Sequence, residues 1–99
     1  MMIRIVQLTF ADAHCTGFEA LFETLRNDIR QFPGCSHLEL WKDRSRPGVY
    51  CTYSIWSGPD ALDAYRHSDL FAQTWSTIKP WFSAKPDAWS LDRIASANL

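Results

Sequence analysis

Apolar residues follow two different periods along the chain. Residues 3–10, 35–43 and 49–56 are rich in Ile, Val, Leu, Thr and aromatic side chains, and residues 86–94 form a shorter segment of this kind, so all four are predicted strands. Elsewhere, apolar side chains recur at spacings of three and four, which predicts an amphipathic helix after the first strand and another before the last. The first helical stripe contains Phe18, Leu21, Phe22, Leu25, Ile29 and Phe32, and the second contains Phe71, Thr74, Trp75, Ile78 and Phe82.

The first helix has recognisable start and stop signals. Thr16 and Glu19 fit a capping box, in which each side chain satisfies an otherwise unpaired backbone amide at the helix start. Residues 11–15 are therefore predicted to be a connection. Pro33-Gly34 is predicted to end the helix, because proline does not continue the hydrogen-bond ladder and glycine tolerates a positive φ.

The second half of the chain contains similar signals. Residues 46–48, Arg-Pro-Gly, suit a type II turn, which would join the second and third strands as a hairpin. Ser57 is predicted to cap the next helix, with Pro59 in its first turn. Ser68 offers a second cap, which predicts a break in the helical segment, and Pro80 is predicted to bend or end it.

The order of these elements is β-α-β-β-α-β, which predicts an α+β fold of the ferredoxin-like kind, with helices on one face of a four-stranded antiparallel sheet. A length of 99 residues predicts a single domain over residues 1–99. Neither residues 3–10 nor residues 49–56 have a clearly polar side, whereas an antiparallel sheet with one face in water should alternate. The sequence therefore predicts a homodimer, in which a second copy covers the free face.

Charge and hydropathy limit the partners. The net charge is −1, and Lys and Arg are scattered singly rather than in a basic stripe, so nucleic-acid binding is not expected. No apolar run approaches the roughly 20 residues that span a bilayer. The first residues lack the layout of a secretory signal. We expect a cytoplasmic protein with no membrane partner.

Histidine, cysteine and glycine form no metal, nucleophile or phosphate motif. The three cysteines are widely spaced, which predicts reduced thiols, and no Cys-x-x-Cys or His-x-x-x-His pair occurs. His14 is predicted to lie in a connection, His37 in a strand and His67 near a helix end, and none has a nucleophile at a diagnostic spacing. Four scattered glycines give no phosphate-binding loop. These patterns favour neither a metal nor a bound nucleotide or flavin.

Aromatic residues gather on the third strand and the second helical segment. The set comprises Tyr53, Trp56, Tyr65, Phe71 and Trp75. Rings at such spacings either fill a core or line a pocket, and both interpretations stay open at this point. Buried phenol and indole groups need hydrogen-bond partners, and so does Gln7, an amide in an otherwise apolar strand. An apolar cleft between sheet and helices with a few polar tips would suit a flat ligand.

Three local motifs resemble the family of antibiotic biosynthesis monooxygenases. They are the Phe-Pro-Gly-Cys turn at residues 32–35, the Trp56-Ser57 strand exit, and the run from Ala61-Leu62 to Ser68-x-x-Phe71. The resemblance covers nearly the whole chain. It implies dimers whose two sheets meet as an α/β barrel, with a pocket between sheet and helices in each subunit. Some members oxygenate aromatic polyketide intermediates without a metal or prosthetic group, and others bind and cleave haem.

The haem-cleaving branch of this family can be compared position by position. Its pattern has an Asn late in the first strand, a Trp in the second helical segment and a haem-ligating His ten residues after that Trp. The matching positions here are Gln7, Tyr65 and Trp75. Because an indole does not ligate iron and His67 is displaced from the ligand position, the resemblance implies cofactor-free oxygenation rather than haem degradation.

The resemblance thus implies a cofactor-independent monooxygenase for a small aromatic or quinone-like compound, which the protein would hold as an anion and shield from water. The implied catalytic residues are Tyr65 and His67, the latter as a proton acceptor. A non-catalytic small-molecule-binding or structural dimer is the alternative on the same scaffold, and haem binding is a weaker one. The implied substrate-binding residues are Gln7, Tyr53, Trp56, Phe71 and Trp75.

Overall fold

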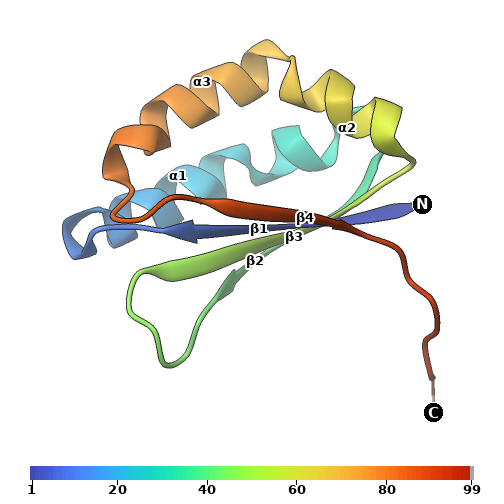
Figure 1. Cartoon of the computed structure of the whole chain (residues 1–99). Coiled ribbons are helices and arrows are strands. Elements are labelled where there is room, and N and C mark those ends of the chain that lie inside the picture. Colours follow the sequence, from blue (N-terminus) through green and yellow to red (C-terminus); the bar gives the residue numbers. More distant parts are fainter. Residues whose placement is uncertain (99) are drawn as a thin grey trace.

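The computed structural model describes residues 1–98 and arranges four strands and three α-helices in two layers (Figure 1). One turn of 3₁₀ helix, η1, follows the last α-helix. In chain order, the elements are β1 (Met2–Thr9), α1 (Asp12–Arg30), β2 (Cys35–Lys42), β3 (Val49–Trp56), α2 (Pro59–Arg66), α3 (Asp69–Ile78), η1 (Lys79–Trp81) and β4 (Asp87–Leu91). This is the predicted α+β, ferredoxin-like order, with the second helical segment divided in two.

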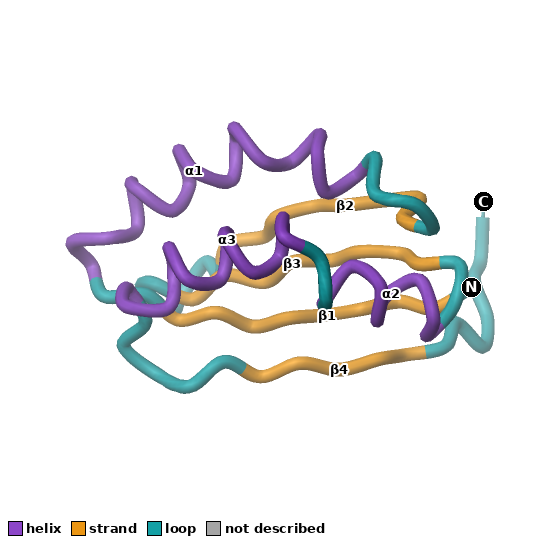
Figure 2. Tube along the Cα trace, turned by 90° about the horizontal axis from the view of Figure 1, so that it is seen from above, coloured by secondary structure: helices purple, strands orange, loops and turns teal. Residues whose placement is uncertain are grey.

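The sheet is antiparallel throughout, with strand order β2-β3-β1-β4. Seen from above, α1 lies over the β2 side of the sheet, and the α2–α3 pair lies nearer β1 (Figure 2). All three α-helices therefore lie on one side of the sheet, here called the helix face. The opposite side, here called the open face, is not covered by any helix of the described chain (Figure 1).

The β2–β3 hairpin closes as the sequence predicts. The Val49 amide donates to the Arg46 carbonyl at 3.4 Å, and Gly48 has φ +78°, as the third position of a type II turn requires. A Cβ at Gly48 would collide with the Phe10 carbonyl oxygen, so this position needs glycine for space as well as for conformation. The Asp43 carboxylate supports the loop by accepting hydrogen bonds from the Arg46 and Ser45 amides, at 2.8 and 2.9 Å.

The predicted start of the first helix is wrong. The helix begins at Asp12, after an extended Ala11 with no side-chain cap, so the capping box at Thr16 does not form and His14 is helical. Tertiary contacts hold the earlier start in place. The Ala11 amide donates to the Trp81 carbonyl at 3.0 Å, and the His14 ring stacks on the Trp81 indole at 5.4 Å. The extra turn is therefore supported by η1, which the local sequence of α1 does not contain.

In the second helical segment, one predicted cap is wrong and one is confirmed. Gly58, rather than Ser57, precedes α2, and no side chain caps it, whereas Pro59 occupies the first turn as predicted. The Ser57 amide instead donates to the Gly34 carbonyl at 2.7 Å. Ser68 caps α3 by accepting from the Phe71 amide at 3.1 Å, and the α-helix ends just before Pro80.

Two clusters of buried side chains hold the helices on the sheet. Even-numbered residues of β1 and β3 point to the helix face, because successive side chains of a strand alternate. The larger cluster consists of Leu8, Phe10, Phe18, Tyr50 and Ile78. The smaller cluster consists of Met2, Cys35, Trp56 and Leu62. Between them, β1 presents Arg4 and Val6 to the helices, and neither is fully buried.

The open face is also apolar, and its side chains are half-covered. Ile5 lies between its sheet partners Tyr53 and Trp89. Trp41 stacks on Tyr53 with ring centroids 5.0 Å apart, and both Trp41 and Trp89 remain 45% exposed. Trp89 and Leu91 share this face, and β4 is shorter than the predicted 86–94. Within residues 1–98, no helix is both long and apolar enough to span a bilayer.

Candidate functional site

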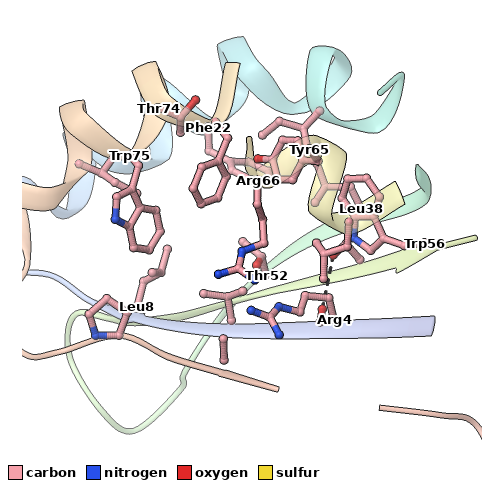
Figure 3. A pocket seen from close by; sticks show the side chains of 18 of the residues that line it. Arg4, Leu8, Phe22, Leu38, Thr52, Trp56, Tyr65, Arg66, Thr74 and Trp75 are labelled. Atoms are coloured by element: carbon pink, nitrogen blue, oxygen red, sulfur yellow. Dashed lines mark hydrogen bonds between the residues drawn. The ribbon is translucent and has the colours of Figure 1, made fainter. Parts of the chain in front are cut away.

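A cavity of about 280 Å³ lies between the sheet and the helices, in the gap between the two core clusters (Figure 3). Its floor includes Val6 and Leu8 of β1 and Thr52 of β3. Phe22 and Ile29 of α1 contribute to one wall, and α2 and α3 contribute the other. The lining is mostly apolar, with a few polar groups, as is typical of small-molecule sites.

One wall of the cavity is a continuous series of aromatic rings. The Trp56 and Tyr65 rings stack at 5.0 Å, Tyr65 meets Phe71 edge-on at 5.3 Å, and Phe71 stacks on Trp75 at 5.5 Å. The cap at Ser68 makes this series possible, because it breaks the helix between Tyr65 and Phe71 and lets α2 and α3 approach the sheet at different angles. A flat apolar ligand would find stacking partners along this wall.

Tyr65 supplies a phenol without a protein partner. Among the described residues, its hydroxyl makes no hydrogen bond, whereas the Tyr50 hydroxyl in the larger cluster donates to the Glu19 carboxylate at 2.5 Å. Burial raises the pKa of Tyr65 to about 12, so the group stays protonated at neutral pH. Tyr65 can therefore donate a hydrogen bond to an oxygen of a ligand in the cavity.

Trp56 contributes an aromatic surface to the cavity but no free hydrogen-bond donor. It is 1% exposed, and its indole Nε1 donates to the Ser54 hydroxyl at 2.9 Å, so its one donor is already used. The Ser54 hydroxyl in turn donates to the Arg4 carbonyl at 3.5 Å. These two hydrogen bonds fix the Trp56 ring against Tyr65, so the donors of the ring wall without a partner in the described chain are the Tyr65 hydroxyl and the Trp75 indole N–H.

Two arginines enter the same cavity, and the sequence reasoning missed both. Arg66, in the last turn of α2, and Arg4, on β1, reach toward each other from opposite sides of the space (Figure 3). Arg4 Nη1 donates to the Ser90 hydroxyl at 2.9 Å. Burial and the charge of Arg66 lower the pKa of Arg4 from its ordinary value. Alternation in β1 was an available signal, because Arg4 falls between helix-facing Met2 and Val6.

The structure brings four of the seven proposed site residues together in this cavity and places the other three elsewhere. Four of the seven do line the cavity: Trp56, Tyr65, Phe71 and Trp75. Gln7 and Tyr53 lie on the open face, because odd-numbered residues of β1 and β3 point away from the helices. His67 follows the end of α2, outside the lining, and its Nδ1 lies 2.8 Å from the Asp63 carbonyl oxygen. The structure therefore separates these three side chains from the ring wall.

The lining contains no histidine, although all three histidines lie in the described chain. Trp75, at the position of the haem-ligating His in the haem-cleaving pattern, lines the cavity with an indole. Within residues 1–98, no group of three or more His, Cys, Asp or Glu side chains is placed to hold a metal ion. Cys15, Cys35 and Cys51 are free thiols. Besides aromatic faces, the polar groups of the lining include the Tyr65 phenol, the Trp75 indole, the hydroxyls of Thr52, Ser54 and Thr74, and the guanidinium groups of Arg4 and Arg66.

Comparison with known proteins gives a consistent result. The family described as antibiotic biosynthesis monooxygenase matches residues 1–75. A candidate antibiotic biosynthesis monooxygenase from Caulobacter crescentus has 26% identity and a TM-score of 0.86, over 95% of this chain and 91% of that one. A second candidate from Deinococcus radiodurans has 18% identity and a TM-score of 0.87, over 100% and 98%.

A more distant structure has a described activity. SnoaB, a cofactor-independent oxygenase from Streptomyces nogalater, has 15% identity and a TM-score of 0.80, over 96% of this chain and 94% of that one. A likeness at this identity shows a shared fold. No curated protein matches the chain significantly. Since the family match covers three quarters of the sequence and the fold agrees over almost all of it, the chain belongs to the antibiotic biosynthesis monooxygenase family.

Proposed function

We propose that the protein is a cofactor-independent monooxygenase that oxidises a small aromatic or quinone-like compound in the cavity between sheet and helices. The observation that carries the proposal is the ring wall of Trp56, Tyr65, Phe71 and Trp75. Within the described chain, the Tyr65 hydroxyl and the Trp75 indole N–H of this wall make no hydrogen bond, so both can donate to an oxygen of a bound ring compound. Family membership supports the oxygenase chemistry.

In the proposed reaction, the substrate supplies the electrons. A phenol, or its keto tautomer, loses a proton and becomes a delocalised anion, which transfers one electron to O₂. Recombination of the radical pair forms a C–O bond, and protonation gives a hydroperoxide. Loss of water then leaves a new carbonyl, so one oxygen atom of O₂ enters the quinone-like product and the other leaves as water.

Each part of the cavity has a role in this sequence. The aromatic wall binds the rings and excludes water, which strengthens every electrostatic interaction inside. The Tyr65 hydroxyl donates to the substrate oxygen and stabilises the negative charge that develops there. His67 lies outside the lining, so the proposed proton acceptor is water at the rim, where exposed Arg66 borders the cavity.

We also propose that two copies pair through their open faces and form the α/β barrel implied by the family. The support is the row of half-exposed apolar side chains around Ile5, Tyr53 and Trp89, which a soluble single subunit would leave in water. A two-fold contact would bury the same surface of both copies. The cavity lies on the other side of the sheet, so each subunit would keep its own site.

Oxygen consumption tests the function. Purified protein, incubated with a panel of two- and three-ring phenols and keto tautomers such as anthrone, is expected to take up O₂ and form the quinone without added metal or flavin. Tyr65→Phe removes the phenol donor of the ring wall and is expected to lower kcat about 10- to 100-fold. Tyr53→Phe makes the same chemical change on the open face and is expected to keep the wild-type rate.

Other outcomes would contradict the proposal. Ligand binding without oxygen uptake, across the whole panel, would identify a non-catalytic binding protein on the same scaffold. Equal rates for Tyr65→Phe and the wild-type protein would remove Tyr65 from the catalytic residues. A larger loss in Tyr53→Phe than in Tyr65→Phe would place the reaction on the open face.

A further inference from the structure

The cavity holds an excess of positive charge in apolar surroundings. Arg4 and Arg66 both border it, and among the described residues neither guanidinium lies within 4.0 Å of a carboxylate oxygen. Arg4 is partly buried, and its one side-chain partner is the neutral Ser90 hydroxyl. Arg66 is exposed, so the cost of desolvation and of the like charge falls on Arg4, and an anion bound between the two arginines would offset it.

The chain itself does not supply that anion within residues 1–98. Asp87 is the acidic residue of the lining, and it makes no ion pair with either arginine. In the sheet, Asp87 lies opposite Gln7, whose side chain belongs to the open face, whereas Ala88 lies opposite helix-facing Val6. Alternation therefore directs the Asp87 side chain away from the cavity. The positive charge of the two arginines is therefore available to an anionic ligand.

We propose that the ligand of this cavity carries a carboxylate, which Arg4 and Arg66 bind while its fused rings lie against Trp75 and Phe71. The inference deepens the proposed function, on which it rests for the aromatic part of the ligand. Guanidinium groups bind carboxylates with charge-assisted, often bidentate, hydrogen bonds. The two arginines stand at the smaller-cluster end of the cavity and Trp75 toward the larger cluster, so the acid and the rings occupy different ends (Figure 3).

The dimensions of the site limit the ligand to a small molecule. Small-molecule sites span about 300–1,000 Å³, and this cavity of about 280 Å³ is at the lower limit. Two or three fused rings with one carboxylate fit such a volume better than a phosphorylated or nucleotide-sized compound does. The lining is also predominantly apolar, which suits a ligand with a single charged end.

A matched pair of ligands tests the inference on the unmodified protein. The probes are 1-hydroxy-2-naphthoate and its methyl ester, which have the same rings and hydroxyl but differ in charge. Binding is measured by calorimetry and by quenching of tryptophan fluorescence. We expect the acid to bind about tenfold or more tightly than the ester, with an advantage that falls as salt is raised.

Variants then test whether Arg4 and Arg66 are the residues that bind the carboxylate. Arg4→Gln and Arg66→Gln are each expected to weaken binding of the acid about tenfold and to leave binding of the ester within about twofold. Arg44→Gln removes the same charge from an exposed loop position and is expected to change neither. Far-UV circular dichroism checks that each variant is folded, and the comparison of acid and ester in the wild-type protein needs no variant.

The possible outcomes separate this inference from the proposed function. Equal binding of acid and ester would overturn the inference and leave the ring site intact. Failure of both probes to bind would overturn both. Tight, arginine-dependent binding of the acid, together with no oxygen uptake from any phenol or hydroxy acid, would support the inference and overturn the oxygenase. A similar loss in Arg44→Gln would show that the charge acts at long range, and would overturn the assignment to Arg4 and Arg66.

Discussion

The two faces of the sheet carry similar side chains and differ in what covers them. On the helix face, Tyr50 and Trp56 are each 1% exposed and Phe10 is 2% exposed. On the open face, Trp41 and Trp89 are both 45% exposed, although they too are large aromatic residues on strands. Apolar composition alone therefore does not make a core. A core forms where another element packs against the strand, and the open face lacks such an element within the described chain.

The helix face itself is not uniform. At the end near Phe10, aromatic rings meet directly, with the Phe10 and Phe18 centroids 4.2 Å apart. Farther along β1, the helix-facing position is Arg4 rather than a large apolar residue, and the helices leave a cavity there. The site therefore arises where close packing is interrupted by a charged side chain that needs room and a partner.

The largest expected effect comes from breaking the packed end of the helix face. Phe10→Ala removes a ring that contacts Phe18, Tyr50 and Phe82, and it is expected to lower the free energy of unfolding by about 3–5 kcal/mol. Urea unfolding followed by circular dichroism measures the change. Trp41→Ala on the open face is expected to cost about 1 kcal/mol or less in the single subunit, since that ring is already half in water. Equal losses would contradict the contrast between the faces.

A smaller effect is expected from charging the open face. Ile5→Lys places an ammonium group between Tyr53 and Trp89, and it is expected to weaken self-association about 100-fold, equivalent to about 2.7 kcal/mol. Sedimentation equilibrium over a range of protein concentrations measures the dissociation constant. Gln73→Lys, on an exposed position of α3, adds the same charge away from this face and serves as the control.

The outcome of this experiment bears directly on the open face. A wild-type chain that stays monomeric and fully folded at high micromolar concentration would contradict the proposed dimer. Equal weakening by Gln73→Lys would assign the effect to net charge rather than to the face. If Ile5→Lys abolishes pairing but keeps ligand binding, the two faces act independently.

The smallest effect is expected in the pH dependence of stability, which distinguishes the buried Tyr65 phenol from phenols outside the cavity. The pKa of Tyr65, about 12, lies above the unfolded value of about 10, so its contribution to stability is complete below pH 10 and is lost as pH rises toward 12. The wild-type free energy of unfolding is expected to fall over this range by about 1–2 kcal/mol more than that of Tyr65→Phe. Urea unfolding at pH 9 to 12 measures this difference.

Tyr53→Phe is the control for the loss of one phenol, because it lies on the other side of the sheet. It is expected to keep the full alkaline loss of the wild-type protein. Parallel curves for the wild-type protein and Tyr65→Phe would mean that the Tyr65 hydroxyl is freely hydrated, which would contradict its place in the cavity wall.

Local sequence signals predicted which helices and strands form better than they predicted where each one begins and ends. The β2–β3 turn and the cap at Ser68 were readable because the residues that form them are adjacent in sequence. The start of α1 was not, because Trp81, far along the chain, supports the extra turn at Ala11. For the same reason, the sequence did not reveal that the Ser57 amide donates a hydrogen bond to the Gly34 carbonyl.

The ring wall followed from sequence in part. Helical spacing placed Tyr65, Phe71 and Trp75 on the buried side of their helices, where they do lie. Gln7 was assigned to the same cleft on its polarity, although alternation with Leu8 puts it on the other face. Arg4 was missed because a single arginine in a strand usually marks an exposed edge, and only the packing of α2 brings Arg66 opposite to it.

The sequence by itself determined the order of strands and helices, the apolar character of both sheet faces and the family of the chain, because these depend on local periodicity and short motifs. The tertiary structure alone decided which face the helices cover and which side chains border the cavity. Neighbouring residues of a strand point to opposite sides of the sheet, so a register shift of one residue would move each side chain to the other side. The residues that border the cavity therefore depend on strand register and on contacts between distant segments. The pairing of Arg4 with Arg66 has this origin.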